Sequence, residues 1–380
     1  MISFELTTEQ KRAELHFVRL AKKKFYPLSL KIDSQAPGPI DPAYLAILVD
    51  EDLNALLVPE EYGGRPLDFV TLSLVMEGLG YGCAGFASLY CVTMHAVSAL
   101  LIGGSHEQKA AYLPLLLGHR GGLAGCCITE EKGGSDTTRF ATTANADGDN
   151  YIINGTKSPV LNAGYAAFYV VWANTGTGRG RGDINAFIVP GDAQGISIGP
   201  YHDKPGLRCA PTATVSFTNV KVHKSDMIGP PGSGYPLLVQ SLDGARSLFS
   251  AICVGVAKAA FDMTTSFAKQ RAIRNKPIIR NQGIGFSLAD QATDICAGRL
   301  LVWRVCRMMD RNVHYTKEAS MAKLFASRMA SRIAGEGMLM MGQVAHTNPN
   351  LMAKFQRDAQ ALRLIEGTDH IQQMIISSEL

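Results

Sequence analysis

One carboxylate in this sequence has surroundings that favour acid–base chemistry. Glu366 follows Leu364-Ile365 and precedes Gly367, a glycine that interrupts a helical pattern. Removing a carboxylate from water raises its pKa, so a buried Glu366 would be a better general base near neutral pH. The same local pattern also occurs where a Glu-Gly pair simply ends a helix, and both interpretations stay open at this point.

A second candidate site is the polar segment from Ile128 to Asp136. Its glycines, among them Gly134, would let a ligand approach the backbone closely, and Thr129 and Ser135 offer hydroxyl groups. An ordinary surface turn has a similar composition. The chain shows no metal-ligand spacing among its cysteines and histidines and no G-x-S-x-G motif. We therefore predict no metal site and expect acid–base groups or an organic cofactor to carry the chemistry.

The composition is that of a protein with a large core. Of the 380 residues, 46% are hydrophobic and 18% are charged, which excludes disordered and fibrous classes. A net charge of +4 is too small to indicate nucleic-acid binding. The eight cysteines form no C-x-x-C pair, so we expect buried, reduced thiols and a cytoplasmic location. We expect no signal peptide, because the first residues include acidic side chains and no apolar run.

One stretch raises the question of a membrane. From Gly78 to Ser105 the sequence contains no Asp, Glu, Lys or Arg, which is long enough to span a bilayer. Six glycines and His95 would make this stretch a poor lipid-facing helix. We therefore predict a helix buried on all sides in a protein core, and no membrane association.

Hydrophobic periodicity divides the chain into three regions. Residues 1–122 are predicted to be helical, residues 123–232 to form a compact β domain, and residues 233–380 to form a helical bundle. The last region carries four helical stripes, which argue for a bundle with ligand sites between facing helices. These stripes cover residues 236–267, 286–312, 317–341 and 351–363.

Local signals refine this division. An amphipathic helix is predicted over Leu6–Lys24, and Pro27 is expected to stop it. Asp147-Gly148 and Asn154-Gly155 are turn signals within the β domain.

Taken together, these features resemble the acyl-CoA dehydrogenase family over nearly the whole chain. The resemblance rests on Val58–Gly64, Gly104–Lys109 followed by Tyr112-Leu113-Pro114, the T-E-x-x-x-G-S-D loop from Thr129 to Asp136, Tyr151–Lys157, Phe217–Val222, Arg271, Lys276-Pro277-Ile278, Gln282, Arg357-Asp358-Ala359 and Glu366-Gly367-Thr368. It implies an α+β multidomain fold with an N-terminal α-helical domain, a middle β-barrel-like domain and a C-terminal four-helix bundle. It also implies a homotetramer or homodimer.

The activity implied by this resemblance is FAD-dependent dehydrogenation of an acyl-CoA, with an electron-transfer flavoprotein as electron acceptor. In the family a carboxylate removes the α-proton of the thioester while the β-hydride goes to flavin N5. That carboxylate stands at one of two positions, which correspond here to Glu366 and Ala245. Since Glu366 alone is a carboxylate, the resemblance implies that Glu366 is the catalytic base.

The resemblance also implies binding roles for residues that match family motifs. Ile128, Thr129, Gly134 and Ser135 would contact the flavin or its ribityl chain, and Thr368 the pyrophosphate. Cofactor contacts across a subunit boundary would come from Arg271, Gln282 and Gly342, the remaining glycine of a family glycine motif. Substrate contacts would come from Ser135, Asp243 and Arg246, near the thioester and the pantetheine of CoA.

Two positions beside the flavin depart from the family pattern. Pro159 and Leu161 stand where the family usually has a Trp and a Thr. One alternative function is therefore a dehydrogenase that acts on a carrier-protein-bound acyl group in a specialised biosynthetic pathway. Another is a degenerate, non-catalytic relative that acts as a binding or scaffold subunit. The presence of Glu366 and Arg246 favours an enzyme, because a scaffold needs neither residue.

Overall fold

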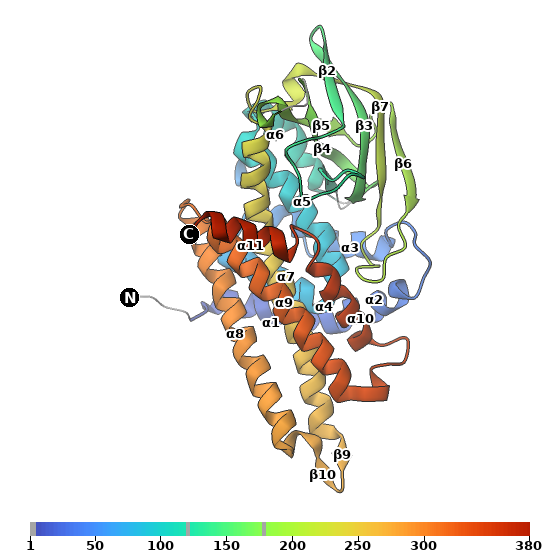
Figure 1. Ribbon diagram of the computed structural model, residues 1–380, viewed down its shortest axis with the longest axis vertical. Coiled ribbons are helices and arrows are strands. Elements are labelled where there is room, and N and C mark those ends of the chain that lie inside the picture. The colour runs from blue at the N-terminus through green and yellow to red at the C-terminus, as the bar shows by residue number, and fades with distance from the viewer. Residues whose placement is uncertain (1–4, 119–121, 177–179) are drawn as a thin grey trace.

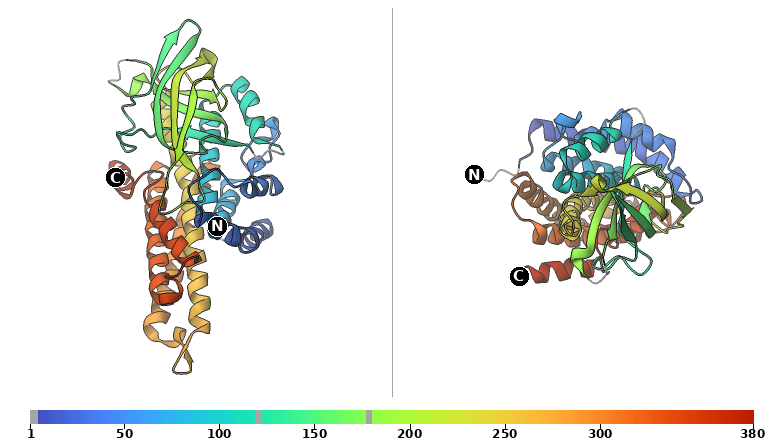
Figure 2. Two further views of the ribbon diagram at one scale, coloured as in Figure 1. Left: turned by 90° about the vertical axis from the view of Figure 1, so that its right-hand side faces the viewer. Right: turned by 90° about the horizontal axis from the view of Figure 1, so that it is seen from above.

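A computed structural model describes residues 5–118, 122–176 and 180–380 of the chain. The β sheet occupies one end of an elongated molecule, the long C-terminal helices extend to the other end, and the N-terminal helices pack beside both (Figures 1 and 2). This arrangement of helical N- and C-terminal parts around a mixed sheet confirms the predicted fold class. The domain limits at residues 122 and 232 stay predictions.

The N-terminal part begins with a helix that continues past the proline expected to end it. Its helices are α1 (Thr8–Leu20), α2 (Tyr26–Asp33), α3 (Pro42–Asp50), α4 (Phe69–Gly82), α5 (Ala84–Gly103) and α6 (His106–Tyr112). Thr7 and Gln10 form a reciprocal capping box at the start of α1. The prediction that Pro27 stops this helix is wrong. A π-helical turn over Ala21–Phe25 leads into α2, and Pro27 lies in the first turn of α2, where proline is tolerated.

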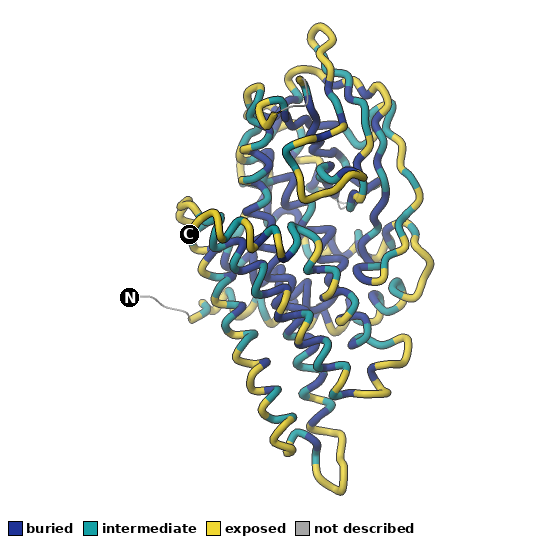
Figure 3. Tube along the Cα trace, in the orientation of Figure 1, coloured by how far each residue is buried: buried dark blue, intermediate teal, exposed yellow. Residues whose placement is uncertain are grey.

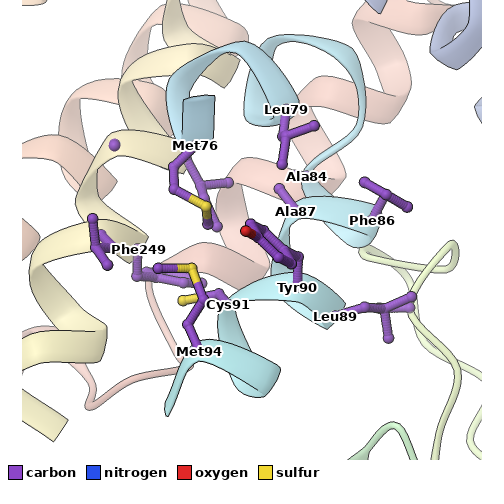
Figure 4. Close-up of a cluster of buried hydrophobic side chains, with 14 of the residues drawn as sticks. Met76, Leu79, Ala84, Phe86, Ala87, Leu89, Tyr90, Cys91, Met94 and Phe249 are labelled. Atoms are coloured by element: carbon purple, nitrogen blue, oxygen red, sulfur yellow. The ribbon is translucent and has the colours of Figure 1, made fainter. Parts of the chain in front are cut away.

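The uncharged stretch forms two helices, α4 and α5, with a break at Cys83. Side chains of both helices pack together and against Phe249 of α7 (Figure 4). Helices α5 and α7 are long and apolar enough to span a membrane, but 78% and 72% of their most apolar windows are buried inside the fold. The prediction of a single helix over Gly78–Ser105 is wrong, because the chain breaks at Cys83, but the predicted burial of this stretch in the core is confirmed.

The middle part is a sheet in the order β6-β7-β3-β2-β4-β5-β8, with β1 parallel to β4. The strands are β1 (Leu123–Cys127), β2 (Thr143–Asp147), β3 (Asn150–Leu161), β4 (Ala166–Asn174), β5 (Ile184–Pro190), β6 (Ile196–Tyr201), β7 (Thr212–His223) and β8 (Met227–Ile228). Asp147-Gly148 forms the predicted turn between β2 and β3.

The second expected turn is absent, because Asn154-Gly155 lies within β3. The pairing register of β3 with β7 shifts at this point, and Gly155 has a φ of +150°. A Cβ at Gly155 would lie 2.5 Å from Thr142 Oγ1, so the glycine allows close backbone approach rather than a chain reversal.

The C-terminal part consists of α7 (Gly234–Gln270), α8 (Gln282–Asp310), α9 (Thr316–Met341), α10 (Leu351–Leu362) and α11 (Asp369–Ser378). The four predicted stripes correspond to α7–α10, and α11 was not predicted. Helix α7 is the central element, and it is buried where it passes the N-terminal helices (Figure 3). Its Gly255 is required there, because a Cβ would lie 2.0 Å from the carbonyl oxygen of Glu77 in α4.

All eight cysteines are free thiols. The expectation that they are buried is wrong for Cys296, which is exposed on α8, and holds only in part for Cys126, which is partly buried. Within the described ranges, no three His, Cys, Asp or Glu side chains come together as a metal site.

Candidate active site

Glu366 lies in the turn that connects α10 to α11. Its backbone is left-handed, with a φ of +55°, and the following Gly367 has a φ of +90°. This backbone turns the Glu366 side chain inward, where its Oε2 atom is buried without a hydrogen-bond partner. Burial raises the pKa of Glu366, while the nearby charges of Arg246 and Lys323 oppose that rise. A desolvated carboxylate without a partner is suited to accept a proton from a ligand.

Side chains from three helices hold the backbone of this turn. Lys323 of α9 donates from Nζ to the carbonyl oxygens of Arg363 and Gly367, at 3.1 and 2.7 Å. The carbonyl of Glu366 accepts from Arg246 Nε of α7, at 3.2 Å, and from Gln372 Nε2 of α11, at 2.9 Å. The Glu366 carboxylate is thus positioned through its backbone and keeps its own oxygen Oε2 free.

Arg246 also forms a buried ion pair with Asp243. The Arg246 Nη1 to Asp243 Oδ1 distance is 2.6 Å, and both side chains are buried. The second oxygen of Asp243 accepts from Thr316 Oγ1 at 2.6 Å. Asp243 and Thr316 line a cavity of about 330 Å³ with His314 and Tyr315. Of the predicted substrate residues, Arg246 therefore contacts the backbone of Glu366, and Asp243, its ion-pair partner, lines a cavity.

Cysteines of α5 and of the end of β1 lie near Glu366. Burial raises the pKa of Cys91 in α5 and of Cys126 in β1, and the Glu366 carboxylate is close enough to raise both further. Cys91 Sγ lies 3.8 Å from the carbonyl oxygen of Ala245, which is buried. The two family positions for a base thus lie in one region, and the loop that begins at Ile128 follows directly after β1.

The loop that follows β1 is held by a buried lysine. Lys157 Nζ lies 2.9 Å from Glu130 Oε1 and donates to the Ile128 carbonyl at 3.1 Å. Glu130 in turn accepts from the backbone N–H groups of Ala141 and Thr142 at 2.6 and 3.0 Å. The same lysine packs 3.8 Å from the centre of the Phe140 ring. These contacts fix the start of the loop that carries the predicted flavin contacts.

The hydroxyl groups of this loop remain available to a ligand. Within the described residues, neither Thr129 Oγ1 nor Ser135 Oγ has a hydrogen-bond partner, whereas the Thr129 carbonyl accepts from Ser158 N–H at 2.8 Å. A Cβ at Gly134 would lie 3.0 Å from Thr129 Cγ2, so a side chain there would crowd this surface. Thr368 is the N-cap of α11, and its Oγ1 accepts from Ile371 N–H at 3.4 Å.

Pro159 and Leu161 lie at the end of β3, where the register with β7 shifts between Lys157 and Val160. Leu161 is partly buried and packs against the main core. The next residue, Asn162, is buried and its Nδ2 donates to the carbonyls of Leu89 and Ala124 at 3.0 and 2.8 Å. The end of β3 is thereby fixed against α5 and β1, close to the Ile128 loop.

The remaining predicted cofactor residues lie elsewhere in the chain. Arg271 ends α7 and Gln282 begins α8, on either side of the β9–β10 hairpin (Ala272–Ile273 and Lys276–Pro277) at the far tip of the bundle (Figure 1). Gly342 ends α9 with a φ of +58°. All three are exposed. One chain therefore does not bring Arg271 and Gln282 to the site around Glu366.

Sequence reasoning missed two buried residues of this site. Lys323 belongs to no recognisable motif, and a lysine in a helical stripe normally indicates a solvated face. His95 is buried, and its Nε2 hydrogen-bonds Ser241 Oγ at 3.1 Å. Burial and the charge of Arg246 lower the pKa of His95 to about 3, so it is neutral near pH 7.

Known proteins match this chain in the same three regions. Sequence models of the acyl-CoA dehydrogenase N-terminal, middle and C-terminal domains match residues 7–120, 125–220 and 232–380. The chain belongs to the acyl-CoA dehydrogenase family. It is 34% identical to the mitochondrial short-chain specific acyl-CoA dehydrogenase of Bos taurus over 95% of this chain and 87% of that protein.

Solved structures agree with this assignment. The structure of butyryl-CoA dehydrogenase from Megasphaera elsdenii has a TM-score of 0.94 and 29% identity, and covers 100% of this chain and 99% of that chain. A prolyl acyl carrier protein oxidase, AnaB, has a TM-score of 0.92 and 25% identity, and covers 99% of both chains.

Members of this family are FAD-dependent oxidoreductases that act on CH–CH bonds, and the chain is an enzyme of this class. The residues present fit FAD, because the loop after β1 combines unpartnered hydroxyls with a glycine whose Cβ would crowd the loop surface.

We expect Lys157→Met to weaken FAD binding by about tenfold, which corresponds to about 1.4 kcal/mol. Without the lysine, the Ile128 carbonyl loses its donor and Glu130 is left buried without its cation, so the loop is no longer fixed. Titration of apoprotein with FAD, followed by flavin fluorescence, measures the affinity. Unchanged affinity in a folded variant would show that Lys157 does not support the cofactor loop.

Proposed function

We propose that the chain catalyses α,β-dehydrogenation of an acyl-CoA with Glu366 as the base. The supporting observation is the inward-facing Glu366 carboxylate, whose Oε2 is buried without a partner and whose pKa is raised by burial. In this proposal Glu366 removes the α-proton of the thioester, and Asp243, Arg246 and Ser135 orient the substrate. FAD, when bound, supplies the acceptor for the hydride that leaves the β-carbon.

Geometry and charge around Glu366 support this role in two ways. The clamp on its backbone fixes where the carboxylate lies without engaging its oxygen Oε2. The cations Arg246 and Lys323 keep the pKa of Glu366 from rising as far as burial alone would take it, so this carboxyl group ionises at a lower pH than it would without them. Ionisation is required before proton abstraction.

The test is anaerobic mixing of the FAD-loaded protein with saturated acyl-CoA thioesters of increasing chain length. We expect loss of the oxidised flavin absorbance and an enoyl-CoA product that is two hydrogens lighter, found by mass spectrometry. The similarity to short-chain and butyryl-CoA dehydrogenases leads us to expect the fastest reduction with short acyl chains. Absence of both signals with every thioester in the series would refute the proposal.

A second candidate substrate is an acyl group bound to a carrier protein. The similarity to a prolyl acyl carrier protein oxidase over 99% of both chains supports this alternative. The same acyl group presented on CoA and on a carrier protein decides between the two, through the ratio of their kcat/KM values.

We further propose an electron-transfer flavoprotein as the electron acceptor, a cytoplasmic location, and a homotetramer or homodimer. Exposed apolar side chains on the C-terminal helices and in the α10–α11 turn support self-association. They include Phe286, Leu339, Leu364 and Met374, with exposed fractions of 63, 83, 62 and 57%.

We expect FAD occupancy to depend on assembly. Arg271 and Gln282 lie far from Glu366 in one chain, so in this proposal they complete the cofactor site of a second copy. Arg271→Ala should therefore lower the flavin content without changing the position or surroundings of Glu366 in the same chain. Sedimentation with absorbance detection at the flavin band measures mass and occupancy together. A fully flavin-loaded monomer would contradict this prediction.

We expect Leu161→Thr to raise the flavin reduction potential by roughly 10–30 mV. The family Thr at this position donates a hydrogen bond to flavin N5, and one neutral hydrogen bond is worth about 0.5–1.5 kcal/mol. For a two-electron couple, about 30 mV corresponds to roughly 1.4 kcal/mol. Dye-equilibrated redox titration of both proteins measures the shift. If the potential is unchanged while flavin stays bound, Leu161 does not lie at N5 and only packs against the core.

A further inference from the structure

Lys204 lies in the connection between β6 and β7, where it lines a cavity of about 420 Å³. It shares this cavity with the segment between α2 and α3, of which Gln35, Ala36 and Pro37 are exposed. Four prolines with a fixed φ make the cavity wall rigid, namely Pro37, Pro39, Pro42 and Pro211. Lys204 is thus partly buried, on a cavity whose rim includes exposed residues.

The hydrogen bonds of Lys204 suit a neutral amine. Its Nζ donates to the carbonyl oxygen of Ala210 at 2.5 Å and to Thr212 Oγ1 at 2.6 Å. A neutral amine keeps two N–H groups, so both of these hydrogen bonds can survive the loss of the ammonium proton. A lone pair then takes the place of the third N–H. Deprotonation of Lys204 therefore leaves its two acceptors satisfied and creates a nucleophile.

Burial and a neighbouring cation lower the pKa of Lys204. Burial is the larger cause, and with the Arg208 guanidinium it brings this pKa to about 8. The groups that oppose the decrease are the Asp358 carboxylate of α10 and the Cys209 thiol. Asp358 is committed to another cation, because it pairs with the buried Lys354. A lysine that is desolvated beside another cation is in the environment that activates an amine as a nucleophile.

Other titratable side chains around the cavity do not hold Lys204 in its charged form. The Asp203 carboxylate pairs with Arg208, at 2.5 Å between Oδ1 and Nη1. Asp41 on the cavity wall pairs with Lys31, at 3.5 Å between Oδ2 and Nζ. His202 also lines the cavity, but an imidazole is either neutral or cationic and cannot stabilise an ammonium by its charge. Within the described part of the chain, Lys204 therefore forms no salt bridge.

We propose that Lys204 is a nucleophilic lysine that takes the acyl group from a short acyl thioester and becomes an Nε-acyl-lysine. The neutral amine attacks the thioester carbonyl carbon, a C–N bond forms and the C–S bond breaks. The thiol leaves with the proton that the amine loses, so an amine and a thioester become an amide and a thiol without any oxidation or reduction. The cavity is small and rich in proline, which suits a short acyl chain. The acyl donor is of the substrate class of the proposed function, but the acylation needs neither Glu366 nor flavin.

The experiment treats the FAD-loaded, full-length protein with S-acetyl-N-acetylcysteamine and locates acetyl groups by peptide mass spectrometry. An acetyl group has no β-carbon, so this thioester cannot be dehydrogenated and the result is independent of the reaction at Glu366. Trypsin does not cleave before proline, so Lys204, which precedes Pro205, is found in the peptide from Gly182 to Arg208 with or without acetylation. At pH 7.5 we expect Lys204 to be acetylated about tenfold or more faster than the exposed Lys31.

The rate should follow the ionisation of Lys204. Compared with an ordinary lysine pKa of about 10.4, a pKa of about 8 leaves on the order of a hundredfold more neutral amine near neutral pH. A less basic amine is also a weaker nucleophile, so the expected gain in rate is smaller than that factor. Acetylation of Lys204 should therefore rise with pH and level off above a midpoint near pH 8. In urea the preference for Lys204 should disappear, because unfolding returns its amine to water.

Ala36, on the exposed part of the cavity wall, tests the route to Lys204. Ala36→Phe should fill part of the cavity and slow the acetylation of Lys204 severalfold, while Lys31 keeps its rate. Ala36→Ser is the matched control and should change neither rate. The proposal is overturned if Lys204 in the folded protein is acetylated no faster than Lys31, if its rate keeps rising through pH 9.5, if its preference persists in urea, or if Ala36→Phe leaves its rate unchanged.

Discussion

Glu366→Gln is expected to lower the rate of flavin reduction by acyl-CoA by about 10²–10⁴-fold, the usual loss when a general base is removed. Glutamine keeps the shape of the side chain but cannot accept the α-proton. The backbone clamp of Arg246, Lys323 and Gln372 acts on carbonyl oxygens, so it should survive the substitution. Anaerobic stopped-flow at the flavin band measures the rate, and flavin content confirms that the cofactor stays bound.

The same substitution should make the protein more stable at neutral pH. The pKa of Glu366 is raised in the folded state, so the native protein binds more protons than the unfolded chain between the two pKa values. The stability contribution of Glu366 is therefore fully present below its unfolded pKa and is lost as pH rises through its folded pKa. The difference in Tm between Glu366→Gln and wild type should grow as pH increases from 5 to 8.

An exposed glutamate supplies the matched control for both measurements. Glu9→Gln on α1 removes one carboxylate from the surface and should change neither the rate nor the pH dependence of Tm. If Glu366→Gln retains more than a tenth of the wild-type rate, another residue must be the base. If its Tm shows no pH-dependent gain, the Glu366 carboxylate is not desolvated as the structure indicates.

Residues in recognisable motifs were easier to predict than residues that act through the backbone. Glu366 could be singled out because a carboxylate between apolar residues and glycine is unusual, and Arg246 because it matches a family position. The two cysteines beside Glu366 could not be found, because their proximity depends on how α5 and β1 pack against the α10–α11 turn. Such contacts join segments far apart in the chain.

Local sequence signals for turns and helix ends gave wrong predictions where tertiary contacts determine the backbone conformation. Pro27 was expected to end a helix, but a π-helical turn before it places the proline where no N–H is needed. Asn154-Gly155 carries a turn signal, yet the close approach of Thr142 and the hydrogen bond that Asn154 accepts from Asn219 N–H hold it in a strand. The overall order of helical, β and helical regions was predictable because long periodic segments average out such local exceptions.

The environment of Lys323 is the opposite of what its sequence position suggests. A lysine on a long helix is normally exposed, but the Lys323 side chain is fully buried, because it satisfies the carbonyls of Arg363 and Gly367 in the α10–α11 turn. We expect Lys323→Met to lower kcat by about 10–100-fold. Without the two hydrogen bonds from Lys323, the α10–α11 turn is less fixed, and the Glu366 carboxylate can shift away from the position that proton abstraction requires. Stability should fall as well, because two carbonyls lose a donor.

The pH profile separates this positioning role from a merely structural one. The charge of Lys323 opposes the burial-induced rise in the pKa of Glu366, so its removal should raise that pKa further. Because the base acts when deprotonated, the acidic limb of the kcat/KM profile should move to higher pH in Lys323→Met. Lys323→Arg keeps the charge and should leave the limb in place even where kcat falls. Arg332→Met, on the outer face of the same helix, is the control and should change neither parameter. A Lys323→Met enzyme whose acidic limb coincides with that of wild type would show that Lys323 supports the fold without influencing the base.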